Sequence, residues 1–138
     1  MIAFDADVLS LIFNGDSGCI QKAARIPVAE QCVPIVVIDQ ILRGRLHAIR
    51  QAEAGKAKAD LDVAYFYLER TIADLKGAHV LSFMPSVEVM VQGWRNQKIK
   101  VGISDLRIAA ICIVHSATLI SRNRRDFDQV PGLLVEYW

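Results

Sequence analysis

The sequence has little that marks a secreted, membrane-spanning or zinc-binding protein. Its three cysteines are widely spaced and form no CxxC pair, which predicts free thiols in a reducing cytoplasm. No apolar run reaches the roughly 18 residues that a membrane span needs, and the acidic Asp5 argues against a signal peptide. The three histidines share no spacing with one another or with cysteine, so we expect no zinc site. A soluble, cytoplasmic protein without membrane association is the expectation.

An excess of charge of one sign is also missing. Sixteen Lys and Arg residues balance fifteen Asp and Glu residues, giving a formal net charge of +1. The overall composition therefore does not indicate a nucleic-acid-binding protein. The charged stretch 121–126 contains three arginines and could meet phosphates. Such a stretch is more often a solvated turn than a phosphate-binding surface, so the neighbouring structure has to decide between the two.

Hydrophobic residues, by contrast, are plentiful. They make up 53% of the 138 residues, and the mean hydropathy is +0.29. This length is typical of one domain with a sizeable core, and the sequence contains no repeat, linker or low-complexity segment. We expect a single domain over residues 1–138. The high apolar content also suggests that a partner protein covers some apolar surface.

Short apolar runs alternate with segments of helical periodicity. The expected strands are 2–5, 35–38, 80–83, 117–120 and 133–137, and the expected helices are 7–13, about 16–25, 39–54, 56–76, 85–97 and 104–114. The stretch between Pro27 and Pro34 reads as irregular, and a turn or short helix is expected around Asp126. This alternation predicts a three-layer α/β domain with a central, mostly parallel sheet of about five strands. The helices 39–54 and 56–76 are expected to pair as a hairpin.

Two of these segments carry strong local signals. Residues Ile35–Ile38 are all β-branched, which is typical of a strand buried on both faces in a parallel sheet. The segment 104–114 is apolar almost all round after its first turn, which predicts a buried helix.

Acidic residues stand where several of these segments begin or end. Asp5 ends the first strand, Asp105 opens the buried helix and Asp126 follows the fourth strand. The carboxyl ends of parallel strands share one edge of a sheet, so folding can bring these acids together. Carboxylates held close together repel one another unless a cation lies between them. The pattern therefore favours Mg²⁺ or Mn²⁺, and with it phosphodiester chemistry.

Each acid also has a purely structural interpretation. Asp105 and Asp7 could lie in the first turns of helices, where the helix dipole favours an anion. Asp126 could cap the turn before Phe127. Asp5 is the hardest to explain in this way, because an acid at the end of a buried strand costs free energy unless it is compensated.

Four stretches and the C-terminal segment together resemble the PIN domains of VapC-type toxins. They are Phe4–Ser10, Ile38–Leu46, Asp105–Ala110, Ser121–Phe127 and Val130–Trp138. None is specific alone, but they follow in the order and spacing of that family and span essentially the whole chain.

The resemblance implies a Mg²⁺- or Mn²⁺-dependent endoribonuclease. Such a protein is usually the toxin of a toxin–antitoxin pair, is dimeric, and is neutralised by a small antitoxin. Asp5, Asp105 and Asp126 fall on acidic positions of the family's site, and Asp7 falls on a polar position beside the first. The RNA target is not predicted.

One position departs from the family. The family usually has Glu four residues before the glycine that aligns with Gly44, and this chain has Gln40 there. A carboxamide can accept hydrogen bonds but brings no charge and cannot act as a base. Asp39 is adjacent, but neighbours on a helix point about 100° apart, so it replaces the lost carboxylate only if the helix begins later or rotates. Both residues are site candidates, with Gln40 the better positional match.

Further residues are secondary candidates. Ser121 and Asn123 could hold a metal-bound water or could form turn hydrogen bonds. Arg122, Arg124 and Arg125 are candidate contacts for RNA phosphates.

Two other functions remain open at this stage. The first is a PIN domain with an incomplete acidic set that binds RNA or an antitoxin without cutting. The second is a phosphatase of the haloacid-dehalogenase type, because that family also begins with a strand followed by Asp-x-Asp. The phosphatase would need a lysine and paired acids in later motifs, and Asp126–Asp128 is a poor substitute.

Overall fold

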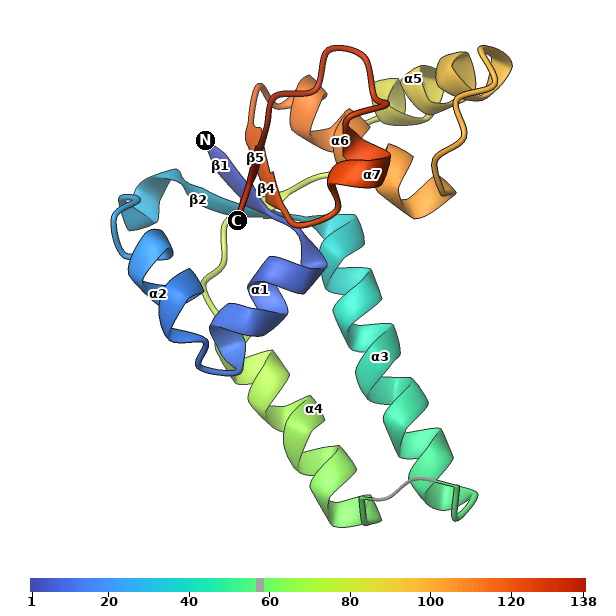
Figure 1. Ribbon diagram of the computed structural model, residues 1–138. Helices are drawn as coiled ribbons and strands as arrows, with labels where there is room; N and C mark the ends of the chain where they lie inside the picture. Colours follow the sequence, from blue (N-terminus) through green and yellow to red (C-terminus); the bar gives the residue numbers. More distant parts are fainter. Residues whose placement is uncertain (57–58) are drawn as a thin grey trace.

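A computed structural model describes residues 1–56 and 59–138 (Figure 1). Five strands form one sheet in the order β3-β2-β1-β4-β5, and every neighbouring pair is parallel. Their bounds are Ile2–Phe4 (β1), Gln31–Pro34 (β2), Val80–Leu81 (β3), Thr118–Ser121 (β4) and Val135–Tyr137 (β5). The predicted α/β class with a five-stranded parallel sheet is confirmed.

Helices flank this sheet on both sides. They are α1 (Ala6–Phe13), α2 (Ser17–Ala23), α3 (Ile35–Glu53), α4 (Leu61–Leu75), α5 (Pro85–Asn96), α6 (Ile103–Val114) and α7 (Arg124–Phe127), with a short 3-10 helix at Val28–Glu30. Figure 1 shows α1 and α2 on one face of the sheet and α5 and α6 on the other. The hairpin of α3 and α4 extends away from the sheet.

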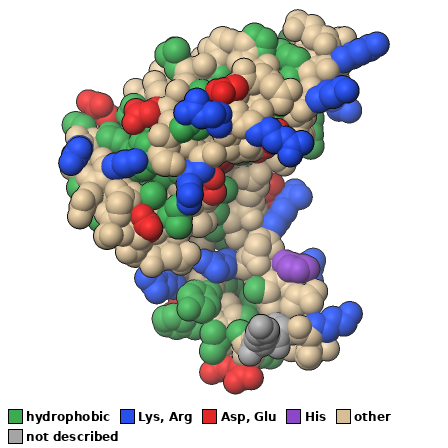
Figure 2. Space-filling model, viewed as in Figure 1, with side chains coloured by type: hydrophobic (Ala, Val, Ile, Leu, Met, Phe, Trp, Pro, Cys, Tyr) green, Lys and Arg blue, Asp and Glu red, His purple; other side chains and the backbone are tan. Residues whose placement is uncertain are grey.

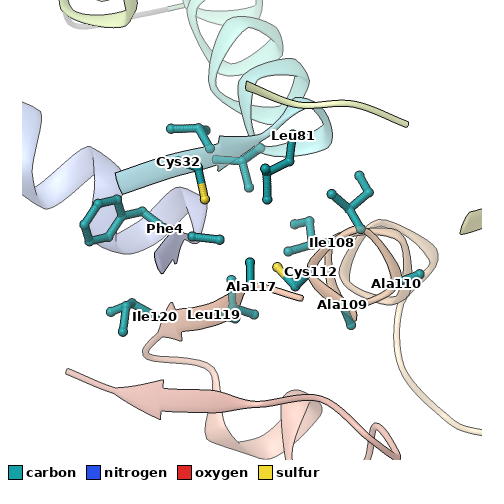
Figure 3. Packing of buried hydrophobic residues seen from close by; sticks show 14 of the residues in the cluster. Phe4, Cys32, Leu81, Ile108, Ala109, Ala110, Cys112, Ala117, Leu119 and Ile120 are labelled. Atoms are coloured by element: carbon teal, nitrogen blue, oxygen red, sulfur yellow. The ribbon is translucent and has the colours of Figure 1, made fainter. Parts of the chain in front are cut away.

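The core lies between the sheet and α6 (Figure 3). Ile108 and Cys112 of α6 point toward Leu81 and Leu119 of the sheet, and all four side chains are buried. Burying an aliphatic side chain of this size contributes roughly 1.5–3 kcal/mol. Because α6 is buried here, nearly every face of the segment 104–114 is apolar. The predicted buried helix is confirmed.

The helical hairpin forms as predicted, with one change at its turn. Helices α3 and α4 pack along each other and bury Ile49, Ala64 and Thr71. Helix α4 begins at Leu61, after Asp60 at the N-cap, rather than at Lys56. Residues 57–58 of the predicted helix lie outside the described part of the chain.

The predicted strand at Ile35–Ile38 is wrong. These residues form the first turn of α3, and the second strand is Gln31–Pro34, inside the stretch predicted to be irregular. Cys32 and Val33 are buried in the sheet, while Pro34 ends the strand and is the N-cap of α3. A proline lacks the backbone donor that a sheet interior needs, but it is well suited to this junction. Tertiary packing thus outweighs the β-propensity of the four residues.

Cys19, Cys32 and Cys112 are free thiols, and all three are buried. Burial raises the pKa of each of them. Within the described ranges, no helix is both long and apolar enough to cross a lipid bilayer.

Candidate active site

Asp5 is the buried acid at the end of β1. Phe4 pairs with Ile120 of β4, so Asp5 lies level with Ser121, the last residue of that strand. The Ser121 hydroxyl donates a hydrogen bond of 2.7 Å to Asp5 Oδ2, and the backbone N–H of Ala6 donates one of 2.8 Å to Oδ1. Only 6% of Asp5 is exposed. Burial raises its pKa, and these two hydrogen bonds offset only part of that effect.

Asp105 reaches the same place from the first turn of α6. Its pKa rises from 3.8 to about 6. Burial is the largest cause, followed by the negative charges of Asp5, Asp126 and Asp7. Asp5, Asp105 and Asp126 come from separate segments of the chain, and the fold brings them to one edge of the sheet.

Asn123 links two of the acids. Its side-chain amide nitrogen donates to Asp126 Oδ2 at 2.9 Å and to Asp105 Oδ2 at 3.2 Å. Its oxygen accepts the backbone N–H of Asp126 at 3.4 Å, which caps the short helix α7. Its own backbone N–H donates to the Ser121 hydroxyl at 3.0 Å. The hydrogen bonds expected of Ser121 and Asn123 in this turn are present, and both residues also contact the acids directly.

Asp7 lies at the rim of the cluster. It is exposed, in the first turn of α1, and accepts the backbone N–H of Val8 at 2.7 Å. Its negative charge is one of the smaller causes of the raised pKa of Asp5 and Asp105. Its place in the first turn of α1, whose N-cap is Asp5, and its proximity to the acids therefore coexist.

The donors of this cluster suit a hard divalent cation such as Mg²⁺ or Mn²⁺. They are carboxylate oxygens that repel one another, and a cation between them would remove that repulsion. The Asn123 amide, with its partial positive charge, already stands between two of the carboxylates. Among residues 1–56 and 59–138, no three acidic, histidine or cysteine side chains converge closely enough to enclose an ion as they stand.

The early start of α3 sets the directions of Asp39 and Gln40. Asp39 is exposed and pairs with Arg43 at 2.9 Å, one turn further along the helix. Gln40 instead lines a groove of about 390 Å³ between α3 and α1, together with Asp7. Gln40 thus shares this groove with Asp7, while Asp39 does not line it.

The three candidate RNA-binding arginines are exposed around α7. Arg124 lies over the Tyr137 ring, 4.2 Å from its centroid, and 3.9 Å from Asp128. Arg122 is near Asp16, where it adds to the lowering of the Asp16 pKa that is caused mainly by the Cys19 backbone N–H. Their contact with RNA stays a prediction.

The groove contains residues that the sequence patterns did not single out. Ser10 and Asn14 face it from α1, and Gly44 and Arg45 face it from α3. The signal that could have identified them is helical spacing. Gln40 and Gly44 lie one turn apart on α3, and so do Ile41 and Arg45.

No protein-family model matches the chain, and no curated protein matches its sequence. Solved structures match over nearly its whole length. VapBC2 from Rickettsia felis, bound to a promoter DNA fragment, matches with a TM-score of 0.76 and 17% identity, over 100% of this chain and 99% of that one. FitAcB from Neisseria gonorrhoeae matches with a TM-score of 0.74 and 18% identity, over 98% of this chain and 96% of that one. VapBC-5 from Mycobacterium tuberculosis, a member of a family of toxin–antitoxin systems, matches with a TM-score of 0.61 and 20% identity, over 99% of this chain and 95% of that one.

These likenesses define the class of fold. The chain has a PIN-like α/β fold, the fold of the VapC chains of such complexes. At 16–20% identity the similarity concerns the fold, so the chemistry has to be inferred from the residues of the site.

Proposed function

We propose that this chain is a metal-dependent endoribonuclease that acts as the toxin of a toxin–antitoxin pair. The observation that carries the proposal is the meeting of Asp5, Asp105 and Asp126 at one edge of the sheet, where Ser121 donates to Asp5 and Asn123 donates to both Asp105 and Asp126. Carboxylates that approach one another in this way, with Asp5 buried, cost stability and are expected where a site binds a cation. The PIN-like fold and the VapBC and FitAB neighbours support the toxin assignment.

Asp5, Asp105 and Asp126 would hold the Mg²⁺ or Mn²⁺ ion. When bound, the ion polarises the phosphoryl oxygen and lowers the pKa of a water molecule that acts as nucleophile. Ser121 holds Asp5 in place, and Asn123 orients Asp105 and Asp126 toward each other. Gln40 and Asp7 border the cluster on the side of α1 and α3.

We also propose a small antitoxin as partner, a homodimer as the assembly and the cytoplasm as the location. The solved neighbours include a toxin–antitoxin complex from Klebsiella pneumoniae. Apolar side chains gather on α4, as Figure 2 shows, and this surface fits the expectation that a partner covers part of the chain.

A second function is favoured by Gln40. The position that borders the acids from α3 carries a neutral amide, while Asp39 pairs with Arg43 on the exposed side. With one carboxylate fewer, the site would bind a cation less tightly. The chain would then bind RNA or an antitoxin without cutting.

Cleavage of total RNA by purified protein, with Mg²⁺, with Mn²⁺ and with a chelator, tests the activity. The natural chain should cut only with metal, and Asp105→Asn should lower the rate about 100-fold or more, because it removes a metal-binding charge while keeping the shape of the side chain. Parallel assays on p-nitrophenyl phosphate identify a phosphatase.

Gln40→Glu separates the two PIN-domain functions. A silent natural chain with an active Gln40→Glu variant would establish a binding protein. Equal activity of the two would show that the remaining acids suffice. Hydrolysis of p-nitrophenyl phosphate without RNA cleavage would contradict both.

A further inference from the structure

The groove between α1 and α3 begins at the acid cluster. Asp7 and Gln40 lie at the end near the acids, and Asn14 and Arg45 lie further along the two helices. From Gln40 to Arg45 the helix rises about 7 Å, which is comparable with the span of one nucleotide. A strand whose scissile phosphate lies at the acids could therefore place a neighbouring phosphate in this groove.

The chemistry of the groove suits an anion. Ser10, Asn14 and Gln40 present hydroxyl and amide groups that can donate hydrogen bonds, and Arg45 adds a full positive charge. Asp7 is the one acid among the lining residues. Donors with a single cation and an open side are typical of a phosphate-contacting surface.

Arg45 is held in position by uncharged groups. Its Nε donates a hydrogen bond of 2.9 Å to the hydroxyl of Thr71, which is 2% exposed between α3 and α4. The guanidinium also lies over the Tyr67 ring, 5.3 Å from the centroid. Among the described residues, Arg45 forms no ion pair with an acidic side chain. Its one side-chain hydrogen bond there is made through Nε, and its two terminal Nη atoms make none. The hydrogen bond through Nε thus orients Arg45. The positive charge and the two Nη atoms of its guanidinium remain available to bind an anion.

Gly44 keeps the groove open. It lies in the interior of α3, where glycine is less favourable than alanine. A Cβ placed on Gly44 would meet no atom within 4 Å, so close packing does not require a glycine here. A side chain at this position would instead project into the groove beside Arg45.

We propose that the groove between α1 and α3 is a phosphate-binding subsite for single-stranded RNA, with Arg45 as the residue that binds a phosphate next to the scissile one. The proposal rests on the proposed ribonuclease function and adds the positioning of the substrate to it. Arg45 would contribute to RNA binding rather than to the chemical step, and Gly44 would leave space for the phosphate.

Binding of a fluorescein-labelled single-stranded RNA tests the subsite. It is measured by anisotropy in Mg²⁺, in an Asp105→Asn background whose cleavage is expected to be slower by about 100-fold or more. Arg45→Gln should weaken binding about 10-fold, because it removes one charged hydrogen-bonding contact. It should also lower the slope of log affinity against log salt by about 0.7, the contribution of one phosphate contact. Arg45→Lys should keep the salt slope and lose only part of the affinity.

Two matched controls come from the same protein. Arg43→Gln removes an exposed arginine of the same helix that pairs with Asp39, and it should leave affinity and slope unchanged. Gly44→Leu fills the groove and should weaken binding about as much as Arg45→Gln. Gly93→Leu, at an equally open glycine inside α5, should have no effect. Thermal unfolding of every variant checks that the fold is intact.

An RNA whose phosphates are replaced one at a time by neutral methylphosphonates completes the test. Arg45→Gln should add no further loss of affinity for the RNA in which the contacted phosphate is already neutral.

Equal effects of Arg45→Gln and Arg43→Gln, or unchanged RNA affinity with weakened antitoxin binding, would overturn the subsite. If Arg45 governs binding while the natural chain cuts no RNA, only the proposed activity fails. If the background variant binds no RNA, the subsite fails as well.

Discussion

Asp105 carries the least favourable charge of the acid cluster. Its carboxyl group binds a proton more tightly in the folded protein, with a pKa of about 6, than in the unfolded chain, where the value is 3.8. Folding therefore takes up a proton in this pH range. The contribution of Asp105 to the free energy of unfolding consequently falls as the pH rises from about 4 to about 6 and stays low above that range.

Replacing Asp105 with Asn should stabilise the metal-free protein at neutral pH. The pKa difference corresponds to about 3 kcal/mol, and solvent screening of this partly exposed group reduces the expected gain to about 1 kcal/mol. Urea unfolding of both proteins in chelator between pH 4 and pH 8 measures it. The gain should vanish toward pH 4, where the native carboxyl is protonated. A gain that does not depend on pH would contradict this electrostatic origin.

The sequence identifies some site residues better than others. Asp5 stands out because an acid ending an apolar strand requires compensation, and Ser121 supplies it from the adjacent strand. Asn123 was a secondary candidate, since sequence spacing does not reveal that one amide bridges two carboxylates. The sequence does not distinguish Arg45 from the other arginines of the helix, because only the packing shows that Arg45 lines the groove between α1 and α3.

At the scale of elements, the prediction of secondary structure from the sequence fails at the junction of β2 and α3. Ile35–Ile38 has the composition of a buried strand, but only Val37 of these four is fully buried, as expected for one face of a helix. The strand before it is short and ends in Pro34, which hides its character. The long periodic helices, including α6 and the α3–α4 hairpin, were predicted more reliably because many residues contribute to each pattern.

Gly44 and Gly93 give a prediction about the helices themselves. Both lie inside helices with ordinary backbone geometry, and a Cβ at either position meets no atom within 4 Å. Gly44→Ala and Gly93→Ala should each raise the free energy of unfolding by about 0.5–1 kcal/mol, since alanine loses less backbone entropy in a helix. Urea unfolding measures both. Destabilisation by Gly44→Ala alone would show a tight contact at α3 and contradict the open groove.

At the scale of the whole molecule, the hairpin leaves an apolar surface uncovered. On α4, Ile72 is 60% exposed and Phe66 is 56% exposed, and shallow hollows lie beside Ile72. Figure 2 shows apolar side chains gathered on the hairpin, with charged side chains around them. The apolar residues of 61–75 thus pack against α3 and also leave an apolar surface that fits the proposed partner.

A charge placed in this surface should weaken the complex with the antitoxin. Ile72→Lys is expected to lower the affinity for the proposed antitoxin by about 10-fold or more, because it places an unpaired charge in an apolar contact. Val89→Lys is the matched control, since Val89 is 74% exposed on α5, far from the hairpin surface. Both variants should unfold at the temperature of the natural chain, because neither side chain belongs to the core. Calorimetric titration gives the affinities, and sedimentation of the natural chain alone reports on the homodimer. Equal affinities of the two variants would place the antitoxin on another surface.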